Sequence, residues 1–211
     1  MTKLILASKS PRRFELLSMT GLSFEVENAH VDEDKVLADV LSSYQEEGMR
    51  ADMYLIAQEV ACAQAQAKAS AALQDRSDVI VIGSDTVVVT ESEILGKPRD
   101  EEDARRMLKE LSGKTHRVYT GVSIQAKGEI RNFYAYADVT FLPLDDMQEK
   151  LIETYIASGS PMDKAGAYGI QDAGSLLIDT VSGDYYAVVG LPVSRLLREM
   201  RAMPACAPLF T

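Results

Sequence analysis

Two long runs of β-forming residues in the middle of the chain constrain its fold more than any other feature. They cover residues 116–126 and 129–142, and only Lys127 and Gly128 separate them. Two strands joined through so short a connection containing glycine are expected to pair as an antiparallel hairpin. The chain is therefore predicted to contain a sheet that is at least partly antiparallel.

Helices are expected between further strands. An apolar run at residues 4–6 is the right length for a buried strand, and a short helix follows it and ends at Gly21. Residues 36–74 are rich in Ala, Gln, Glu and Leu and contain almost no helix breaker besides Gly48, so they are predicted to be helical. Additional strands are expected at residues 23–27, 78–89, 93–95, 175–181 and 185–189, and additional helices at residues 100–111, 145–157 and within 190–200. This mixture favours the α/β class with a partly antiparallel sheet.

The domain organisation is expected to be simple. The chain has 211 residues, of which 46% are hydrophobic, and this is enough for a substantial core. Neither an internal repeat nor a linker rich in Pro, Gly or Ser divides it, so residues 1–211 are predicted to form a single domain. Residues 204–211 are predicted to be a frayed tail.

The charge and the cysteines exclude several classes of function. The net charge of −10 argues against nonspecific binding to nucleic acid or to an anionic membrane, because both need a basic surface. Cys62 and Cys206 provide neither a disulfide framework nor the spacing of metal ligands. No segment resembles a signal peptide, and no apolar stretch approaches the roughly 18 residues of a membrane span. We therefore expect a cytoplasmic protein whose anion sites, if any, are local.

One such anion site is outlined at residues 8–13, between the first strand and the first helix. Ser10 is placed to cap the helix, with Ser8 close by, and Pro11 suits the first helical turn. Arg12 and Arg13 add two cations to a helix N-terminus that already attracts anions. An ordinary capped turn with solvated arginines explains the same residues. Since successive helical residues point about 100° apart, one arginine is expected to contact a ligand and the other to brace the fold.

Two acidic residues and a lysine complete a candidate site for a polyphosphate. Asp85 lies in the apolar run 78–89 beside Gly, Ser and Thr, which predicts a rigidly held carboxylate at a bend in a buried strand. Glu33, in the acidic loop 31–35, is its candidate partner, and Lys97 is a third group that a polyphosphate would need. Two carboxylates from separate segments suit Mg²⁺ bound together with substrate phosphates. A satisfied turn aspartate and a solvated loop glutamate are the alternative explanations. His30 and His116 lie in no ligand-spaced cluster and are expected to be surface or packing residues.

Six segments in order through the chain are LASKSPRR, GSDTVV, LGKPRD, LSGKTHRVYTGV, SGSPMDKAGAYGIQ and YYAVVGLP. Together they resemble the Maf family of nucleoside triphosphate pyrophosphatases, and within it the branch that acts on dTTP and UTP. The resemblance implies an inosine-triphosphatase-like fold, with a mixed twisted central sheet flanked by helices and two lobes around a cleft. It also implies hydrolysis of a nucleoside triphosphate to the monophosphate and pyrophosphate with a divalent metal cation, Mg²⁺ or Mn²⁺.

The resemblance also assigns residues to roles. It places the general base at Asp85, and the specificity positions fall on Arg12, Thr86 and Gln171. A glutamine amide offers both a donor and an acceptor, which matches the imide edge of uracil or thymine. The resemblance also matches Lys97 to a phosphate-handling lysine and Glu33 to an acid of the metal site. From the residues themselves, Arg13, Ser8 and Ser10 are further substrate-binding candidates, and Asp85 is expected to share the metal with Glu33. Lys68 lies near a helical lysine of the family, in a region where residues 42–67 depart from the usual length.

Other interpretations remain open at this stage. The family's association with septum formation suggests a nucleotide-binding regulator of cell division with little hydrolysis. A further branch prefers methylated GTP, and Gln171 within YGIQ argues against that branch. The ranking of dTTP, UTP and modified pyrimidine nucleotides stays open, because one methyl group is worth only ~1–3 kcal/mol in a pocket. A homodimer is expected because that is the commonest assembly.

Overall fold

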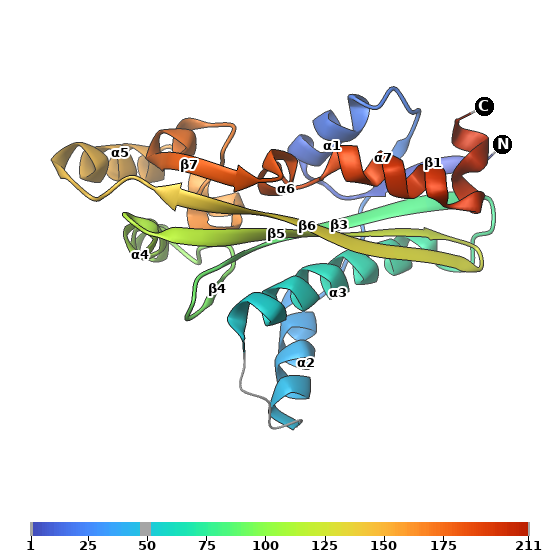
Figure 1. Ribbon diagram of the computed structural model, residues 1–211, viewed down its shortest axis with the longest axis horizontal. Helices are drawn as coiled ribbons and strands as arrows, with labels where there is room; N and C mark the ends of the chain where they lie inside the picture. Colours follow the sequence, from blue (N-terminus) through green and yellow to red (C-terminus); the bar gives the residue numbers. More distant parts are fainter. Residues whose placement is uncertain (1, 47–51, 211) are drawn as a thin grey trace.

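The computed structural model describes residues 2–46 and 52–210, and within these ranges seven strands form one mixed sheet (Figure 1). The strand order is β2-β1-β3-β5-β6-β7, with β4 paired to β3. β1 runs parallel to β2 and β3, whereas the other pairs are antiparallel. The strands are β1 Lys3–Ala7, β2 Glu25–Glu27, β3 Val79–Val89, β4 Ile94–Leu95, β5 Thr115–Ala126, β6 Glu129–Phe141 and β7 Ile178–Gly183. The predicted α/β class with a mixed sheet is confirmed.

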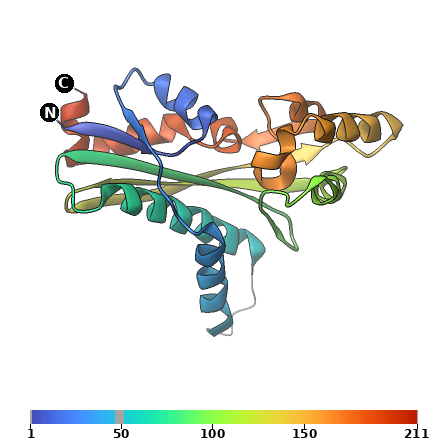
Figure 2. The ribbon, with the colours of Figure 1, turned by 180° about the vertical axis from the view of Figure 1, so that it is seen from behind.

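Helices cover both faces of this sheet. The α-helices are α1 Pro11–Ser18, α2 Glu33–Glu46, α3 Met53–Leu73, α4 Glu101–Leu111, α5 Asp146–Ala157, α6 Tyr185–Val189 and α7 Val193–Ala202. The 3₁₀ turns are Ser160–Asp163, Ala165–Ala167, Ala173–Leu177 and Pro204–Leu209. In Figures 1 and 2, α3 runs along one face and α1 and α7 lie on the other. The sheet is thus the middle layer of three.

The alternation of side chains along β1 explains the two layers. Leu4 and Leu6 pack with α1 and α7, while Ile5 and Ala7 pack with α3. The helix α3 lies unusually close to the sheet because Gly83 and Gly121 stand beneath it. A Cβ atom added at Gly83 would lie 2.2 Å from the carbonyl oxygen of Ala65 in α3. This close approach brings the side chains of α3 directly over β3.

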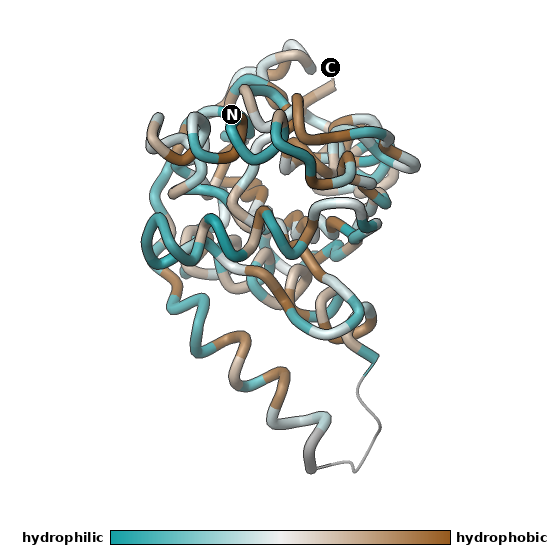
Figure 3. The backbone as a smooth tube through the Cα atoms, turned by 90° about the vertical axis from the view of Figure 1, so that its left-hand side faces the viewer, coloured by the Kyte–Doolittle hydropathy of each residue, from teal (hydrophilic) through white to brown (hydrophobic). Residues whose placement is uncertain are grey.

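Helix α2 projects away from the body of the molecule, as Figures 1 and 3 show. Its partly buried Leu37, Val40 and Leu41 pack against the cluster that α3 forms with β3 and β5. Helical structure was expected over residues 36–74, and α2 and α3 bear this out, whereas Gly48 lies outside the described residues. The acidic loop expected at 31–35 is shorter, because Glu33 already begins α2.

The hairpin prediction is confirmed in detail, since Ala126 pairs with Glu129 at its closed end. The predicted bend at Asp85 is wrong. β3 continues without interruption from Val79 to Val89 and pairs with β5 along most of that length. Gly83 is needed there for close helix packing rather than for a turn.

Two further predictions near the C-terminus are wrong. Residues 185–189 form α6 instead of a strand, because Asp184 caps the N–H groups of Tyr186 and Ala187 and Gly190 ends the helix with φ of 122°. Strand β7 begins only at Ile178, after a 3₁₀ turn.

The C-terminal segment also differs from the frayed tail that the sequence predicts. Residues 204–209 form a 3₁₀ turn whose Cys206 is completely buried in the cluster on the α1 and α7 side. The N–H of Ala205 donates a hydrogen bond of 3.1 Å to the Glu129 carboxylate. Apolar contacts and this bond anchor the segment on the β5–β6 hairpin.

Candidate active site

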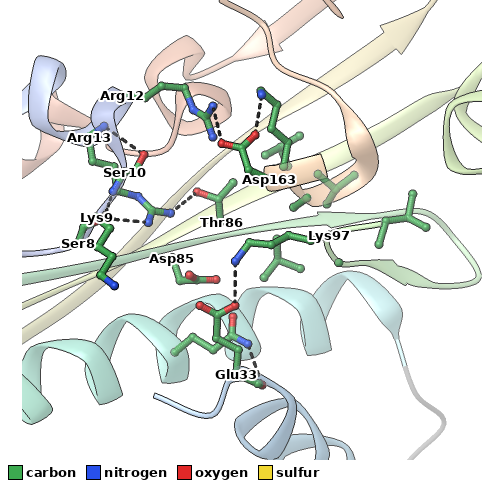
Figure 4. A pocket seen from close by; sticks show the side chains of 18 of the residues that line it. Ser8, Lys9, Ser10, Arg12, Arg13, Glu33, Asp85, Thr86, Lys97 and Asp163 are labelled. Carbon is green, nitrogen blue, oxygen red and sulfur yellow. Dashed lines mark hydrogen bonds and ion pairs between the residues drawn. The ribbon is translucent and has the colours of Figure 1, made fainter. Parts of the chain in front are cut away.

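A cavity of about 1250 Å³ opens between the turn after β1, the start of α2, the middle of β3 and residues 162–170 (Figure 4). Eight residues singled out in the sequence line it: Ser8, Ser10, Arg12, Arg13, Glu33, Asp85, Thr86 and Lys97. They come from four separate parts of the chain. The fold therefore brings together the scattered cations and carboxylates that the sequence pattern pointed to.

The acidic end of the cavity centres on Lys68, which α3 places over β3. Its ammonium contacts the Asp85 carboxylate and donates a hydrogen bond of 2.7 Å to Oε1 of Glu33. Both Lys68 and Asp85 are buried. Gly83 and Asp85 are two residues apart on β3 and therefore face the same helix. The sequence offered only the family position as a signal for Lys68, whose role as the bridge between both acids was not foreseen.

Glu33 is fixed at the start of α2. The side chain of Gln64 donates to its backbone carbonyl at 3.1 Å, and Lys97 Nζ lies 3.5 Å from its Oε2. Burial by itself raises the pKa of the Glu33 carboxyl, but the hydrogen bond from Lys68 and the charges of Lys68 and Lys97 lower it below its ordinary value overall. Glu33 therefore remains an anion facing the cavity at neutral pH.

Arg13 braces the other side of β3. Its guanidinium donates to the carbonyl oxygen of Gly190 at 2.9 Å, to Thr86 Oγ1 at 3.1 Å and to Ser8 Oγ at 3.4 Å. Burial lowers the pKa of Arg13. Thr86 also shares a hydrogen bond of 2.8 Å with Thr120. Arg13 thus holds α1 against β3 through acceptors of the protein itself.

The Arg12 side chain points in a different direction from that of Arg13. Figure 4 shows its side chain extending across the cavity toward Asp163. The nearest nitrogen of Arg12 lies 3.9 Å from Oδ2 of Asp163, and the Arg12 side chain is 30% exposed. Neither Asp163 nor its neighbour Lys164, which also lines the cavity, was predicted from the sequence to be a site residue. Both lie in the segment SGSPMDKAGAYGIQ, where only Gln171 was assigned a role.

Lys164 anchors the segment that carries Asp163. Its buried ammonium lies 2.7 Å from Asp163 Oδ1 and 3.3 Å from Asp172 Oδ2. Tyr155 donates to the same Asp172 carboxylate at 2.8 Å and accepts from the N–H of Gly169 at 3.0 Å. Burial favours a higher pKa for Asp163, but the hydrogen bond from Lys164 lowers it overall.

Gln171 is placed differently from the other sequence candidates. Its side chain is exposed, and the cavity wall ends at Gly169 and Ile170 instead. Gln171 is therefore the one specificity position of the three that does not line this cavity, although its neighbour Ile170 does.

The donor set fits a magnesium-like cation. Two carboxylates, from Glu33 and Asp85, converge on one positive group, the Lys68 ammonium, so the space between them suits a cation. Within the described part of the chain, no group of three or more His, Cys, Asp and Glu side chains is arranged to hold a metal ion. A divalent metal held here would need further oxygen ligands, which substrate phosphates and water supply.

The chain is similar to a family of known proteins along almost its whole length. The profile of a family described as Maf-like protein matches residues 3–203. Proteins named dTTP/UTP pyrophosphatase from Bacillus thuringiensis and from Bacillus cereus strain ATCC 10987 are each 46% identical to this chain over 95% of its length. The matches cover 95% and 90% of those two proteins. A protein of the same name from Bacillus anthracis is 45% identical over 95% of both chains.

Among the described residues, no helix has the length and apolar character to cross a membrane.

Proposed function

This chain belongs to the Maf family, and we propose that it hydrolyses dTTP and UTP to the nucleoside monophosphate and pyrophosphate. The observation that carries the proposal is the convergence of Asp85, Glu33 and Lys68 with Lys97 and Arg12 on one cavity. The relatives that bear the name dTTP/UTP pyrophosphatase support the choice of substrates.

The proposed reaction is an in-line attack of water on the α-phosphorus. A bond forms between the water oxygen and the α-phosphorus, the bond from that phosphorus to the bridging oxygen breaks, and pyrophosphate leaves. The Asp85 carboxylate takes the proton of the attacking water. Because β3 and Lys68 hold this carboxylate in one position, little reorganisation is needed when the proton moves.

The positive groups of the cavity neutralise the triphosphate. Lys97 extends toward the two carboxylates and Arg12 spans the opposite end, so the phosphates would lie between them (Figure 4). Glu33 and Asp85 would hold Mg²⁺ or Mn²⁺, which would supply charge neutralisation at the phosphate oxygens. Lys68 would then share its contacts between these carboxylates and the phosphates.

Two expectations about the cell biology belong to the same proposal. We propose a cytoplasmic location, which the free cysteines Cys62 and Cys206 favour. A homodimer remains a prediction from the general frequency of twofold assemblies.

The test is a substrate panel. The protein is incubated with dTTP, UTP, CTP, GTP and 7-methyl-GTP, with Mg²⁺, with Mn²⁺ or with excess EDTA, and pyrophosphate and monophosphate are measured. We expect equimolar products from dTTP and UTP only when a metal is present. Intact dTTP and UTP after binding has been demonstrated would favour a nucleotide-binding regulator. Preferential cleavage of 7-methyl-GTP would assign the chain to the other branch.

A further inference from the structure

One wall of the cavity, formed by residues 162–170 and called the wall segment below, contains an unfavourable backbone conformation. Ala167 has φ of 61°, in the left-handed region that residues with a Cβ atom rarely adopt, and it directly follows Gly166 with φ of 68°. Ala167 is also completely buried. A residue keeps such a conformation only where its surroundings impose it, so the wall segment depends on the contacts that hold it.

Two backbone N–H groups of the wall segment are bonded to other parts of the fold. The N–H of Gly166 donates a hydrogen bond of 3.0 Å to the carbonyl oxygen of Gly96, the residue before Lys97. The N–H of Gly169 donates to the hydroxyl of Tyr155 in α5, also at 3.0 Å. The wall segment is therefore attached to the loop that carries Lys97 and to α5.

His116 attaches the same segment to the sheet. It lies on β5 and is 1% exposed, and its Nε2 shares a hydrogen bond of 2.7 Å with the hydroxyl of Tyr168. Tyr168 lines the cavity and directly follows Ala167. The rings of His116, Phe141 and Tyr168 pack edge to face, with their centroids 4.9, 5.1 and 5.4 Å apart. The hydrogen bond thus fixes the residue next to the strained position.

Packing by itself does not explain a histidine at this place. Within residues 2–46 and 52–210, Nδ1 of His116 has no hydrogen-bond partner, so a buried polar atom is left unpaired. A phenylalanine would fill the space beside Phe141 without an unpaired atom. In the same part of the chain, the bond to Tyr168 is the only side-chain hydrogen bond of His116. This bond is what a histidine provides here and an apolar ring would not.

We infer that His116 is a positioning residue, which acts through Tyr168 to hold the wall segment in the conformation that binds the nucleotide. The inference rests on the proposed function, because it gives the wall segment a contact with the substrate. When the bond is absent, only a fraction of the molecules has the wall in place, and the apparent affinity falls by that fraction. Asp85 is unaffected, since β3 and Lys68 hold it independently of the wall segment.

The first test is Tyr168→Phe, which removes only the hydroxyl. We expect KM for UTP to rise about five-fold, the effect of one hydrogen bond of ordinary strength, with kcat at saturating UTP unchanged. A substitution that only reduces the amount of folded protein lowers the apparent kcat and leaves KM as it was. Steady-state pyrophosphate release measures both constants. An unchanged KM, with or without a lower kcat, would overturn the inference.

The matched control is Tyr119→Phe. Tyr119 is a second buried tyrosine of β5, and its hydroxyl accepts a hydrogen bond of 3.3 Å from Arg117. It lies three residues after His116 and therefore on the opposite face of the sheet, where it packs in the cluster that α3 forms with β3 and β5. We expect wild-type KM and kcat. The same rise in KM for Tyr119→Phe and Tyr168→Phe would contradict the role of His116.

The double variant with His116→Phe and Tyr168→Phe separates positioning from stability. Two phenylalanines leave no polar atom unpaired at this place, so the unfolding free energy is expected to recover relative to Tyr168→Phe alone. The hydrogen bond is still missing, so KM should stay raised. A KM that returned to the wild-type value together with the stability would show that packing alone positions the wall, and the inference would be wrong.

Hydrogen exchange keeps this test separate from the proposed function. If the wild-type protein cleaves neither dTTP nor UTP, the proposed function fails by itself. The amide exchange rates of Gly166 and Gly169, measured by NMR, then still decide whether His116 holds the wall segment. We expect faster exchange in Tyr168→Phe than in wild type and in Tyr119→Phe, because the bonds of both amides open more often. Equal rates in all three proteins would overturn the inference.

Discussion

The ammonium of Lys68 and the carboxylate of Asp85 form a buried ion pair across the interface between α3 and β3. The pair exists because Gly83 lets the helix backbone approach the strand, so that a lysine on an alanine-rich helix reaches the middle of a buried strand. The same lysine also contacts Glu33 from α2. Three elements thus meet at one ammonium.

Replacing Asp85 by Asn removes the proposed general base while keeping the size of the side chain. We expect kcat to fall by about 10²- to 10⁴-fold, the usual contribution of a positioned base, with UTP binding retained. Pyrophosphate release and calorimetric titration with UTP measure the two quantities. Near-normal turnover in a folded Asp85→Asn protein would disprove the assignment.

Replacing Lys68 by Met leaves two carboxylates facing each other without their counter-ion. Breaking a buried pair costs about 3–5 kcal/mol, and the loss of unfolding free energy is expected near the lower end because Glu33 is 38% exposed. Added Mg²⁺ should restore part of this stability if both carboxylates can bind it. Denaturation in urea with and without Mg²⁺ measures both effects.

Lys109→Met is the matched control for that variant. Lys109 forms an ion pair of 3.1 Å with Glu149 on the surface, and such exposed pairs contribute about 1 kcal/mol or less. Two outcomes would contradict the structural account. One is an equal loss of unfolding free energy in Lys68→Met and Lys109→Met. The other is a Lys68→Met protein whose unfolding free energy does not rise when Mg²⁺ is added.

His116 should make the stability depend on pH. It is buried, its Nε2 lies 2.7 Å from the Tyr168 hydroxyl, and its Nδ1 has no hydrogen-bond partner, so a proton added there would be unsatisfied. Burial lowers its pKa to about 4 from 6.5. As the pH falls below 6.5, the unfolded chain gains a proton that the folded chain takes up only near 4, so folding is progressively destabilised.

At about 1.4 kcal/mol per pKa unit, this effect amounts to about 3 kcal/mol between pH 6.5 and 4. The His116→Gln variant should lose this slope in its unfolding free energy, measured by urea denaturation across that range. His30→Gln replaces an exposed histidine and should keep the wild-type slope. Identical slopes in wild type and His116→Gln would show that His116 titrates normally in the folded protein.

Gly83→Ala tests the close packing of α3. The added Cβ would lie 2.2 Å from Ala65 O and 2.7 Å from Ala69 N, so the helix must shift. We expect a loss of about 1–3 kcal/mol or more in unfolding free energy. Activity should fall as well, because Lys68 lies between these two contacts on the same helix. Thermal and urea denaturation together with pyrophosphate release measure both losses.

For the stability measurement, Gly96→Ala is the control, since a Cβ there meets nothing within 4 Å and Gly96 has no positive φ. A Gly83→Ala protein as stable as Gly96→Ala would mean that the helix stands farther from the sheet than the structure shows.

Much of the fold could be predicted because its signals are local. Ser10 caps α1 and Pro11 occupies its first turn, and the hairpin around Gly128 follows from the residues beside it. The failures have the opposite cause. Residues 185–189 contain the apolar and aromatic residues of a strand, but Asp184 and Gly190 impose a helix on them. The burial of Cys206 likewise depends on a surface that the distant hairpin and α7 provide.

The candidate site likewise has some features that the local sequence predicts and others that depend on contacts between distant parts of the chain. The local sequence was enough to predict which chemical groups are available, because arginines at a helix start, an aspartate in an apolar strand and a lysine after a short strand are placed by their neighbours along the chain. Three features depend on the tertiary structure alone: Lys68 bridges Asp85 and Glu33, Asp163 lies beside Arg12 at the cavity, and Arg13 donates its hydrogen bonds to acceptors of the protein itself. The physical reason is the distance along the chain over which each interaction acts. Capping and periodicity act within a few residues, whereas an ion pair depends on the separation in space of groups that are far apart in the sequence. Lys68 is 17 positions from Asp85 and 35 from Glu33.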